Sequence, residues 1–362
     1  MLLKIPIREA EFVMVQGELT YQEILDDFNS TDYVFILTYN ISARNTNLIN
    51  TLETLPSTTT VDIITNIPNR FETYYGKARN RAREVINVYL NKLDPENFDS
   101  IFSTHFNFKN HAKIIMTNNI VFIGSSNFSD ESANNIECGI ISRDADFIST
   151  LRHSIVPRLK ENSEEYYSDD SINKLRIEYK FNYYLLSSII EKVRMSCHSV
   201  YDERGVYHEF LNLINSYHFA ENLDKLTSTM DDFESTCYRI MHQLEELGIE
   251  TEDINQIVED LGTEEIQLMY STDTSIDEFL SFNNQEYAME YINENEHSAD
   301  FDDIDEFRAS SSQIAYEKES ELAELAETDV EKLLEELDEL KDKAEDLLSL
   351  IPQSINENID NT

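Results

Sequence analysis

The stretch HAKIIMTNNIVFIGSSNFS, residues 111–129, decides how the first part of this chain is interpreted. Two short apolar runs, IIMT and IVFI, are separated by Asn118 and Asn119. Asparagine tolerates positive φ comparatively well, so this pair predicts a tight hairpin. His111 and Lys113 stand at the start of the first run. Because residues i and i+2 of a strand point to the same face, we expect these two side chains to project together.

A second polar cluster follows the second run. If the two runs pair across the turn, Gly124, Ser125 and Asn127 return beside His111. This set suits a phosphodiester, because the imidazole can attack phosphorus while lysine, hydroxyl and amide stabilise charge on the nonbridging oxygens. Gly124 would let the backbone approach the phosphate. The alternative is a hairpin whose polar residues merely face water.

The first 165 or so residues alternate between helical and strand patterns, which is typical of an α/β unit. The predicted elements are a helix over 20–30, strands over 33–42 and 59–69, a helix over 76–93, a strand over 137–144, and a helix over 144–166 that Pro157 kinks or interrupts. From about residue 171 long helical runs dominate. The chain is therefore divided into an α/β domain, residues 1–168, and an all-α domain, residues 169–362.

The polar pattern resembles the signature of the phospholipase D superfamily, H-x-K-x4-D followed shortly by G-S/G-x-N. The residues on family positions are His111, Lys113, Gly124, Ser125 and Asn127. Asn118 occupies the place usually held by aspartate. The resemblance covers about 150 residues, from about 15 to 165, and implies a mixed β-sheet flanked by helices. It also implies a phosphodiesterase that works through a phosphohistidine and needs neither a metal ion nor another cofactor.

The superfamily reaction uses one histidine as the nucleophile and a second to protonate the leaving oxygen. Of the eight histidines in this chain, only His111 has a lysine two positions later. Members with a single motif form symmetric dimers with the active site on the twofold axis. The resemblance therefore implies a homodimer through the α/β domain, with His111 of each subunit facing its mate.

Two further positions follow from the resemblance. Glu137 matches an acidic residue that follows the GSxN segment, and it would orient the imidazole; the alternative is an ordinary residue at the start of a strand. Strand spacing puts Asn118 at the far end of its hairpin from His111. We interpret Asn118 as a turn or support residue, the alternative being an inactive descendant.

A basic run and its neighbours are candidates for nucleic-acid contacts. The run KARNRAR contains Lys77, Arg79, Arg81 and Arg83. Spaced every two residues, these cannot share one helical face, but some could contact phosphates beside the site. A solvated basic helix, or one docked on the acidic half of the chain, is the alternative. Lys109, with His105 and Asn110, could line the same groove.

Charge separates the two halves of the chain. The net charge is -43, yet residues 1–160 hold 15 Lys and Arg against 19 Asp and Glu, which leaves 13 against 52 for residues 161–362. The second half would repel nucleic acid and anionic lipid, whereas the nearly neutral first half can hold a local basic groove. The three cysteines are widely spaced and indicate a reducing cytoplasm. Neither a leader segment nor a membrane span is expected.

The terminal run carries apolar residues in alternating steps of three and four, which is typical of a coiled-coil seam. They are Ala326, Val330, Leu333, Leu337, Leu340, Ala344, Leu347 and Ile351. This seam serves either a long helix packed on its own domain or association with another chain. The polar, acidic segment 293–312 predicts a mobile loop, and 353–362 are expected to fray.

Three functions compete. The first is a nuclease that cuts DNA or RNA, the second a lipid phosphodiesterase or transferase, and the third a noncatalytic interaction protein that keeps the fold. Single-motif members resemble nucleases more than lipases, and no membrane anchor is visible, so a nuclease is favoured. The acidic helical domain would mask the basic groove or dock a protein partner, as in an effector subunit of a defence-type assembly, an analogy of architecture alone.

Overall fold

The chain divides into two compact units, and each is described separately. The computed structural model describes residues 10–42, 44–68, 81–203, 206–211, 213, 216–295 and 304–352. Unit 1 comprises residues 1–181 and 351–362, and unit 2 comprises residues 182–350. The boundary expected after residue 168 lies in the turn before the helix Ser171–Cys197 (α6), whereas the structure divides inside that helix.

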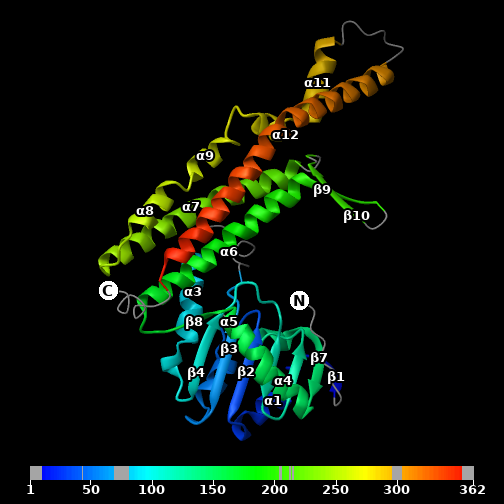
Figure 1. Ribbon diagram of the computed structural model, residues 1–362. Helices are drawn as coiled ribbons and strands as arrows, with labels where there is room; N and C mark the ends of the chain where they lie inside the picture. Colours follow the sequence, from blue (N-terminus) through cyan, green and yellow to red (C-terminus); the bar gives the residue numbers. More distant parts are fainter. Residues whose placement is uncertain are drawn as a thin grey trace. The chain divides into compact units, whose positions relative to one another are not determined.

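Unit 1 is built on one eight-stranded mixed sheet (Figure 1). Its strands are Ala10–Gln16 (β1), Tyr33–Thr38 (β2), Thr60–Thr65 (β3), Ile101–Phe106 (β4), Ile114–Thr117 (β5), Val121–Gly124 (β6), Ile136–Ser142 (β7) and Glu164–Tyr166 (β8). They lie in the order β1-β7-β6-β5-β2-β3-β4-β8. Strands β2, β3 and β4 are parallel, and the other neighbours are antiparallel. The predicted mixed sheet is confirmed, although the sequence did not indicate β1 or β4.

One face of the sheet is covered by the chain that follows β7. The helix Ala145–Thr150 (α4) begins where the Asp144 carboxylate accepts hydrogen bonds from two backbone N–H groups. It continues through a π-helical turn, Leu151–Ile155, into Val156–Glu161 (α5), and Figure 1 shows α4 and α5 across the sheet. Their apolar side chains pack on those of the central strands, and the core cluster includes Phe35, Ile64 and Met116 from the sheet and Phe147, Leu151 and Val156 from the helices.

The predicted helix over 144–166 is wrong at its end. Pro157 lies in the first turn of α5, directly after the π-helical turn, and the helix continues beyond it to Glu161. The helix ends at Glu161, and residues 164–166 form β8, which pairs with the end of β4. The remaining helices of unit 1 before α6 are Gln22–Asp27 (α1), Asn47–Glu53 (α2) and Arg81–Lys92 (α3). Of these, α1 and α3 match predicted helices.

The hairpin of β5 and β6 turns at Asn118 and Asn119 as predicted, but for a different reason. Outside glycine, Asp273 is the one residue with positive φ in the part of the chain that the structure describes. The turn instead depends on Thr117, whose hydroxyl accepts hydrogen bonds from the N–H groups of Asn119 (3.1 Å) and Ile120 (3.3 Å). Asn118 supports the turn from outside: its amide donates to Asp32, and its Oδ1 accepts from Arg152 at 2.5 Å.

Unit 2 is mostly helical. Beyond the end of α6, its helices are Ser216–Glu246 (α7), Glu252–Glu259 (α8), Thr263–Leu268 (α9), Ser275–Ser281 (α10), Asn284–Asn295 (α11) and Ile304–Leu350 (α12). The predicted helical second domain is confirmed, with one exception: His198–Glu203 (β9) and Val206–Leu211 (β10) form an antiparallel hairpin. No helix among the described residues combines the length and hydropathy needed to span a bilayer.

The long terminal helix buries its seam. Part of the loop predicted over 293–312 belongs to α11 and α12; residues 296–303 lie outside the described residues, as do 353–362. Within α12 the apolar seam from Ala326 to Leu347 is at most 1% exposed, and this helix packs against α8, α9, α10 and α11. Packing on its own domain is thus the arrangement observed, and the seam is not a free coiled-coil surface.

Truncation of the seam should destabilise unit 2 without changing its association state. Leu337 is fully buried and Leu325, on the same helix, is 56% exposed. We expect Leu337→Ala to lower the free energy of unfolding by about 2–4 kcal/mol, because it leaves a cavity. Leu325→Ala, the matched control, should change it by less than about 0.5 kcal/mol. Urea unfolding followed by circular dichroism measures both; equal effects would show that the seam is not core.

Candidate active site

His111 and Lys113 lie in the segment that leads into β5, and β5 itself begins at Ile114. The predicted strand therefore starts three residues too early, because residues 111–113 are not part of β5. The two side chains nonetheless meet. The Lys113 ammonium donates to the His111 carbonyl oxygen at 2.6 Å and lies 3.3 Å from the imidazole Nδ1. The imidazole is exposed, whereas Lys113 is 8% exposed.

Asn110 fixes this segment to the end of β2. Its amide nitrogen donates to the carbonyl oxygen of Thr38 at 2.7 Å, and its side-chain oxygen accepts from the N–H of Ala112 at 2.9 Å. A short polar side chain that bonds its own backbone two residues on is a common way to hold an irregular segment. Asn110 thus supports the segment that carries His111.

Tyr39, which the sequence analysis missed, lies at the centre of the site. It directly follows β2, and its ring centroid is 4.8 Å from that of His111. The Lys113 ammonium is 5.4 Å from the same ring centroid, within the range of a cation–π interaction. The backbone N–H of Tyr39 donates to Oδ1 of Asn127 at 3.3 Å. One residue therefore contacts three of the predicted site residues.

The GSSN segment is held by both neighbouring strands. The N–H of Gly124 donates to the carbonyl oxygen of Lys113 at 3.4 Å, so the β5–β6 pairing extends to the motif. The carbonyl oxygen of Asn127 accepts from the Tyr21 hydroxyl at 2.9 Å, and its Oδ1 is occupied by Tyr39. The amide nitrogen of Asn127 is the group that can donate to a substrate oxygen.

Gly124 has a steric role in the sheet, and its expected role in letting the backbone approach a phosphate stays a prediction. A Cβ at Gly124 would collide with the carbonyl oxygen of Cys138 and the ring of Phe122. Gly139, which pairs with Gly124 across β6 and β7, is blocked by the same ring. These glycines let the two strands approach over a buried aromatic ring, so close packing accounts for both.

Ser125 and Glu137 form a hydrogen-bonded pair next to the Gly124–Gly139 contact. The Ser125 hydroxyl donates to the Glu137 carboxylate and accepts from the N–H of Cys138 at 3.0 Å. Glu137, 8% exposed, also accepts from the amide of Asn135 at 3.3 Å. Its hydrogen bonds go to these two neighbours, and orientation of the His111 imidazole by Glu137 stays a prediction.

The predicted basic groove is only partly described. Lys77 and Arg79 lie outside the described residues; Arg81 and Arg83 belong to the first turn of α3, and their side chains are not described. Lys109 is exposed in the loop between β4 and β5. Nucleic-acid contacts by these residues stay a prediction.

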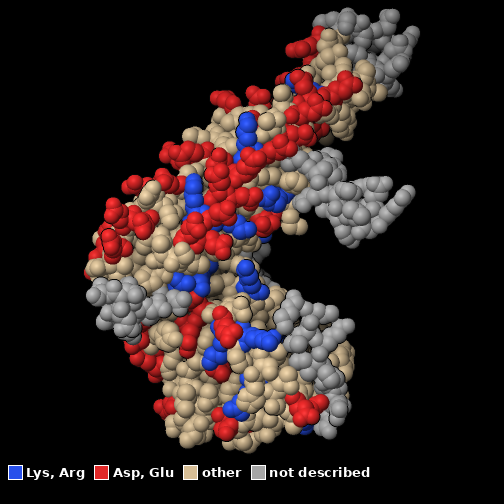
Figure 2. Space-filling model, in the orientation of Figure 1, with Lys and Arg blue, Asp and Glu red and all other residues tan. Residues whose placement is uncertain are grey.

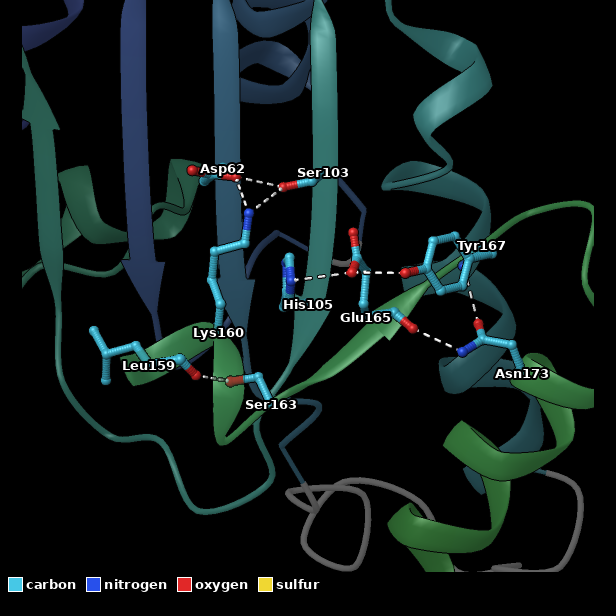
Figure 3. A network of polar contacts seen from close by, with 9 residues as sticks. All are labelled: Asp62, Ser103, His105, Leu159, Lys160, Ser163, Glu165, Tyr167 and Asn173. Atoms are coloured by element: carbon cyan, nitrogen blue, oxygen red, sulfur yellow. Dashed lines mark hydrogen bonds and ion pairs between the residues drawn. The ribbon is translucent and has the colours of Figure 1, made fainter. Parts of the chain in front are cut away.

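His105 does not join the site, contrary to expectation. It is 2% exposed, and its Nε2 lies 3.9 Å from the carboxylate of Glu165 on β8, as Figure 3 shows. Burial and the nearby Lys160 ammonium lower the pKa of His105 to about 4, against weaker opposing effects of Glu165 and Asp62. A histidine held neutral and covered in this way cannot reach a substrate in solution.

The environment of His105 includes a polar cluster on the same face of the sheet, which contains Asp62 and Lys160. Asp62 accepts from Lys160 at 2.7 Å and from Ser103 at 2.5 Å (Figure 3). It also accepts from the Tyr33 hydroxyl at 3.0 Å. Burial alone would raise the pKa of Asp62, but the hydrogen bonds from Lys160 and Ser103 keep the pKa below its ordinary value. The cluster joins α5 to the sheet, and its carboxylate is fully satisfied.

Comparisons with known proteins give similarity of fold alone. No protein-family model matches this chain, and no curated protein does. Among solved structures, it is similar to the phospholipase D family member Nuc from Salmonella typhimurium, with 14% identity and a TM-score of 0.31 over 44% of this chain and 97% of that one. NucT from Helicobacter pylori is similar at 16% identity and a TM-score of 0.31, over 43% and 98%. Polyphosphate kinase from Porphyromonas gingivalis is similar at 12% identity and a TM-score of 0.32, over 61% of this chain and 36% of that one.

The similarity to Nuc covers 44% of the chain, and the remainder is largely helical. At these identities it carries no statement about activity. Among the described residues, no group of three or more His, Cys, Asp and Glu side chains could hold a metal ion.

Stability of unit 1 should fall as pH drops through the range set by His105. Its pKa is about 4 when folded, against an ordinary 6.5, so between these values the unfolded chain binds more protons and stability rises with pH. His105→Gln should remove up to about 3 kcal/mol of this dependence, at about 1.4 kcal/mol per pKa unit. Urea unfolding at pH 4 to 7 measures it. The control is the exposed His153→Gln, and identical slopes in both variants would refute the assignment.

Proposed function

We propose that this chain is a phosphodiesterase with His111 as its nucleophile, and that it is a nuclease acting on DNA or RNA. The observation that carries the proposal is the arrangement around Tyr39. An exposed imidazole has an ammonium 3.3 Å from its Nδ1, and the Asn127 amide is fixed to the same strand end. Cleavage of a phosphodiester needs a nucleophile aimed at phosphorus and donors for the nonbridging oxygens. This set supplies both.

The reaction proceeds in two displacements. In the first, Nε2 of His111 forms a bond to phosphorus as the ester P–O bond breaks, and a second imidazolium gives its proton to the leaving oxygen. In the second, that imidazole takes a proton from water, the water oxygen bonds to phosphorus, and the P–N bond breaks. His111 is regenerated, and neither displacement uses a metal ion or a cofactor.

The position of Lys113 suggests how one residue type fills both roles. With the ammonium donating to Nδ1, a neutral imidazole carries its proton on Nε2. That form cannot attack through Nε2, and it becomes the imidazolium that protonates a leaving oxygen only when Nδ1 also gains a proton. When a phosphate draws the ammonium to its nonbridging oxygens, the proton can reside on Nδ1, and Nε2 becomes the nucleophile. Substrate binding thereby distinguishes two chemically identical histidines.

The second imidazole comes from a second copy of the chain in this proposal, with the active site on the twofold axis. An exposed apolar surface supports the homodimer. Phe12 and Met14 of β1 are 71% and 65% exposed, and Ile136 and Ile140 of β7 are 68% and 41% exposed. Phe12 pairs with Ile140 and Met14 with Cys138, so these side chains share one sheet face. Exposed apolar side chains gathered on one sheet face are a candidate for a protein–protein contact.

This patch borders the half-site. Strand β7 carries Ile136 and Cys138 on the exposed face and Glu137 on the other, and the N–H of Ser125 donates to the carbonyl oxygen of Cys138 at 2.9 Å. Strand β1 is also the edge of the sheet. A self-complementary contact here buries the apolar residues next to the segment that completes the catalytic set.

Charge on this patch should separate the subunits. We expect Met14→Glu combined with Ile136→Glu to convert a dimer into a folded monomer with at least a hundredfold lower nuclease activity, since each monomer holds one imidazole. Light scattering during size-exclusion chromatography measures the mass. Ile101→Glu, which alters an exposed residue on β4, is the control and should leave the dimer intact. An active monomer, or a dimer indifferent to the double variant, would contradict this surface.

Unit 2 supplies the interaction function. Asp and Glu side chains dominate its visible surface over α7, α8 and α12 (Figure 2). Such a surface repels nucleic acid and anionic lipid and favours a basic protein partner. This supports a nuclease subunit that docks a partner, as in a defence-type assembly, over an enzyme that acts at a membrane.

His111→Ala should abolish cleavage, because no other group in the set can form the covalent intermediate. Labelled single- and double-stranded DNA, RNA and phosphatidylcholine vesicles are incubated with both proteins in EDTA. We expect cutting of nucleic acid by the wild type and a loss of at least a thousandfold in the variant. His153→Ala is the control. Turnover of lipid would select the lipid phosphodiesterase, and activity that survives in His111→Ala would refute the proposed nucleophile.

A further inference from the structure

Tyr39 contacts both parts of the candidate site at once. Its ring packs on the His111 imidazole at a centroid distance of 4.8 Å with the planes inclined by 49°. The same ring has the Lys113 ammonium 5.4 Å from its centroid. Its backbone N–H holds the side chain of Asn127. We propose that Tyr39 is a positioning residue, which fixes His111 and Lys113 in the arrangement required for attack on phosphorus; this rests on the proposed function.

The imidazole needs such a support because the part of the chain that the structure describes gives it few other contacts. His111 is exposed and lies before β5, so no strand pairing restrains its backbone. Among the described residues, the polar neighbour of its ring is the Lys113 ammonium, which in the proposed reaction turns to a phosphate oxygen. The face of Tyr39 is then the remaining contact that limits rotation of the imidazole. An attacking nitrogen misplaced by about 1 Å can lose a hundredfold in rate.

Tyr39 can bear this role because its own backbone is fixed on both sides. The preceding residue, Thr38, accepts from Asn110 through its carbonyl and from the N–H of Phe128 at 2.9 Å through its hydroxyl. Two residues later, the N–H of Ile41 donates to the hydroxyl of buried Tyr89 at 3.3 Å. A ring on such an anchored segment keeps its place as substrate enters.

The ring also suits the charges that the reaction creates. The face of an aromatic ring attracts cations. It therefore favours the imidazolium that must protonate the leaving oxygen, and it attracts the Lys113 ammonium beside His111. Phenylalanine offers a similar face, whereas leucine fills comparable space without a quadrupole. The two substitutions separate the aromatic effect from simple packing.

The test compares Tyr39→Leu, Tyr39→Phe and the control Tyr167→Leu, which alters a tyrosine whose hydroxyl bonds Glu165. We expect Tyr39→Leu to lower kcat by about tenfold to a hundredfold with KM changed less than about threefold. Tyr39→Phe and the control should stay within about threefold of the wild type. A fall in kcat/KM through KM alone, or a Phe variant as poor as the Leu variant, would overturn the positioning role.

A second readout does not depend on catalysis. The Tyr39 ring should shift the NMR signals of the His111 ring protons by its ring current, and the assignment follows from their absence in His111→Asn. We expect Tyr39→Leu to abolish the shift and Tyr39→Phe to keep it, with thermal unfolding unchanged. If His111→Ala is fully active, the proposed function fails while this contact is still tested; if the shift is absent in the wild type, the positioning role fails by itself.

Discussion

The end of β2 is the constraint on which the candidate site depends. Thr38 and Tyr39 bond through backbone and side-chain groups to the segment before β5 and to the segment after β6. Because β2 is central and its six residues are all buried, this end cannot move without disturbing the core. The hydrogen bonds to β2 therefore restrain the irregular segments that carry His111 and Asn127. A site on loops gains precision when its loops are tied to one strand end.

Pairing of β5, β6 and β7 supplies the second part of the arrangement. Gly124 faces Gly139, and no other residue fits over the Phe122 ring at that distance. This close approach puts the Ser125 hydroxyl within reach of the Glu137 carboxylate and of the Cys138 backbone. The GSSN segment connects β2 to β7 through two hydrogen-bonded pairs. These are Asn127 with Tyr39 and Ser125 with Glu137. The polar groups of this segment are positioned before any substrate arrives.

Sequence patterns predicted the parts of this site that are local and missed those that are not. Residue spacing was enough to expect that His111 and Lys113 meet, and that the chain reverses at Asn118. Tyr39 has no motif of its own, since it reaches His111 through the pairing of β2 with β5, which sequence spacing does not reveal. Similarly, Glu164 to Tyr166 continue a helical pattern, yet the free edge of β4 recruits them into β8. Tertiary contacts overrode the local signal in both cases.

The contrast between two histidines argues for the half-site. His105 lies on a strand of the same sheet, but burial deprives it of both charge and access. His111 is exposed to solvent, and the Lys113 ammonium lies beside its Nδ1. An imidazole whose Nε2 is bonding to phosphorus has no proton to give the leaving oxygen from that atom, and its Nδ1 faces away, toward the lysine. In the proposed reaction the acid is therefore another group, and His153, the remaining histidine of unit 1, belongs to the π-helical turn before α5. The proposed second copy of His111 would meet this requirement with the same side chain.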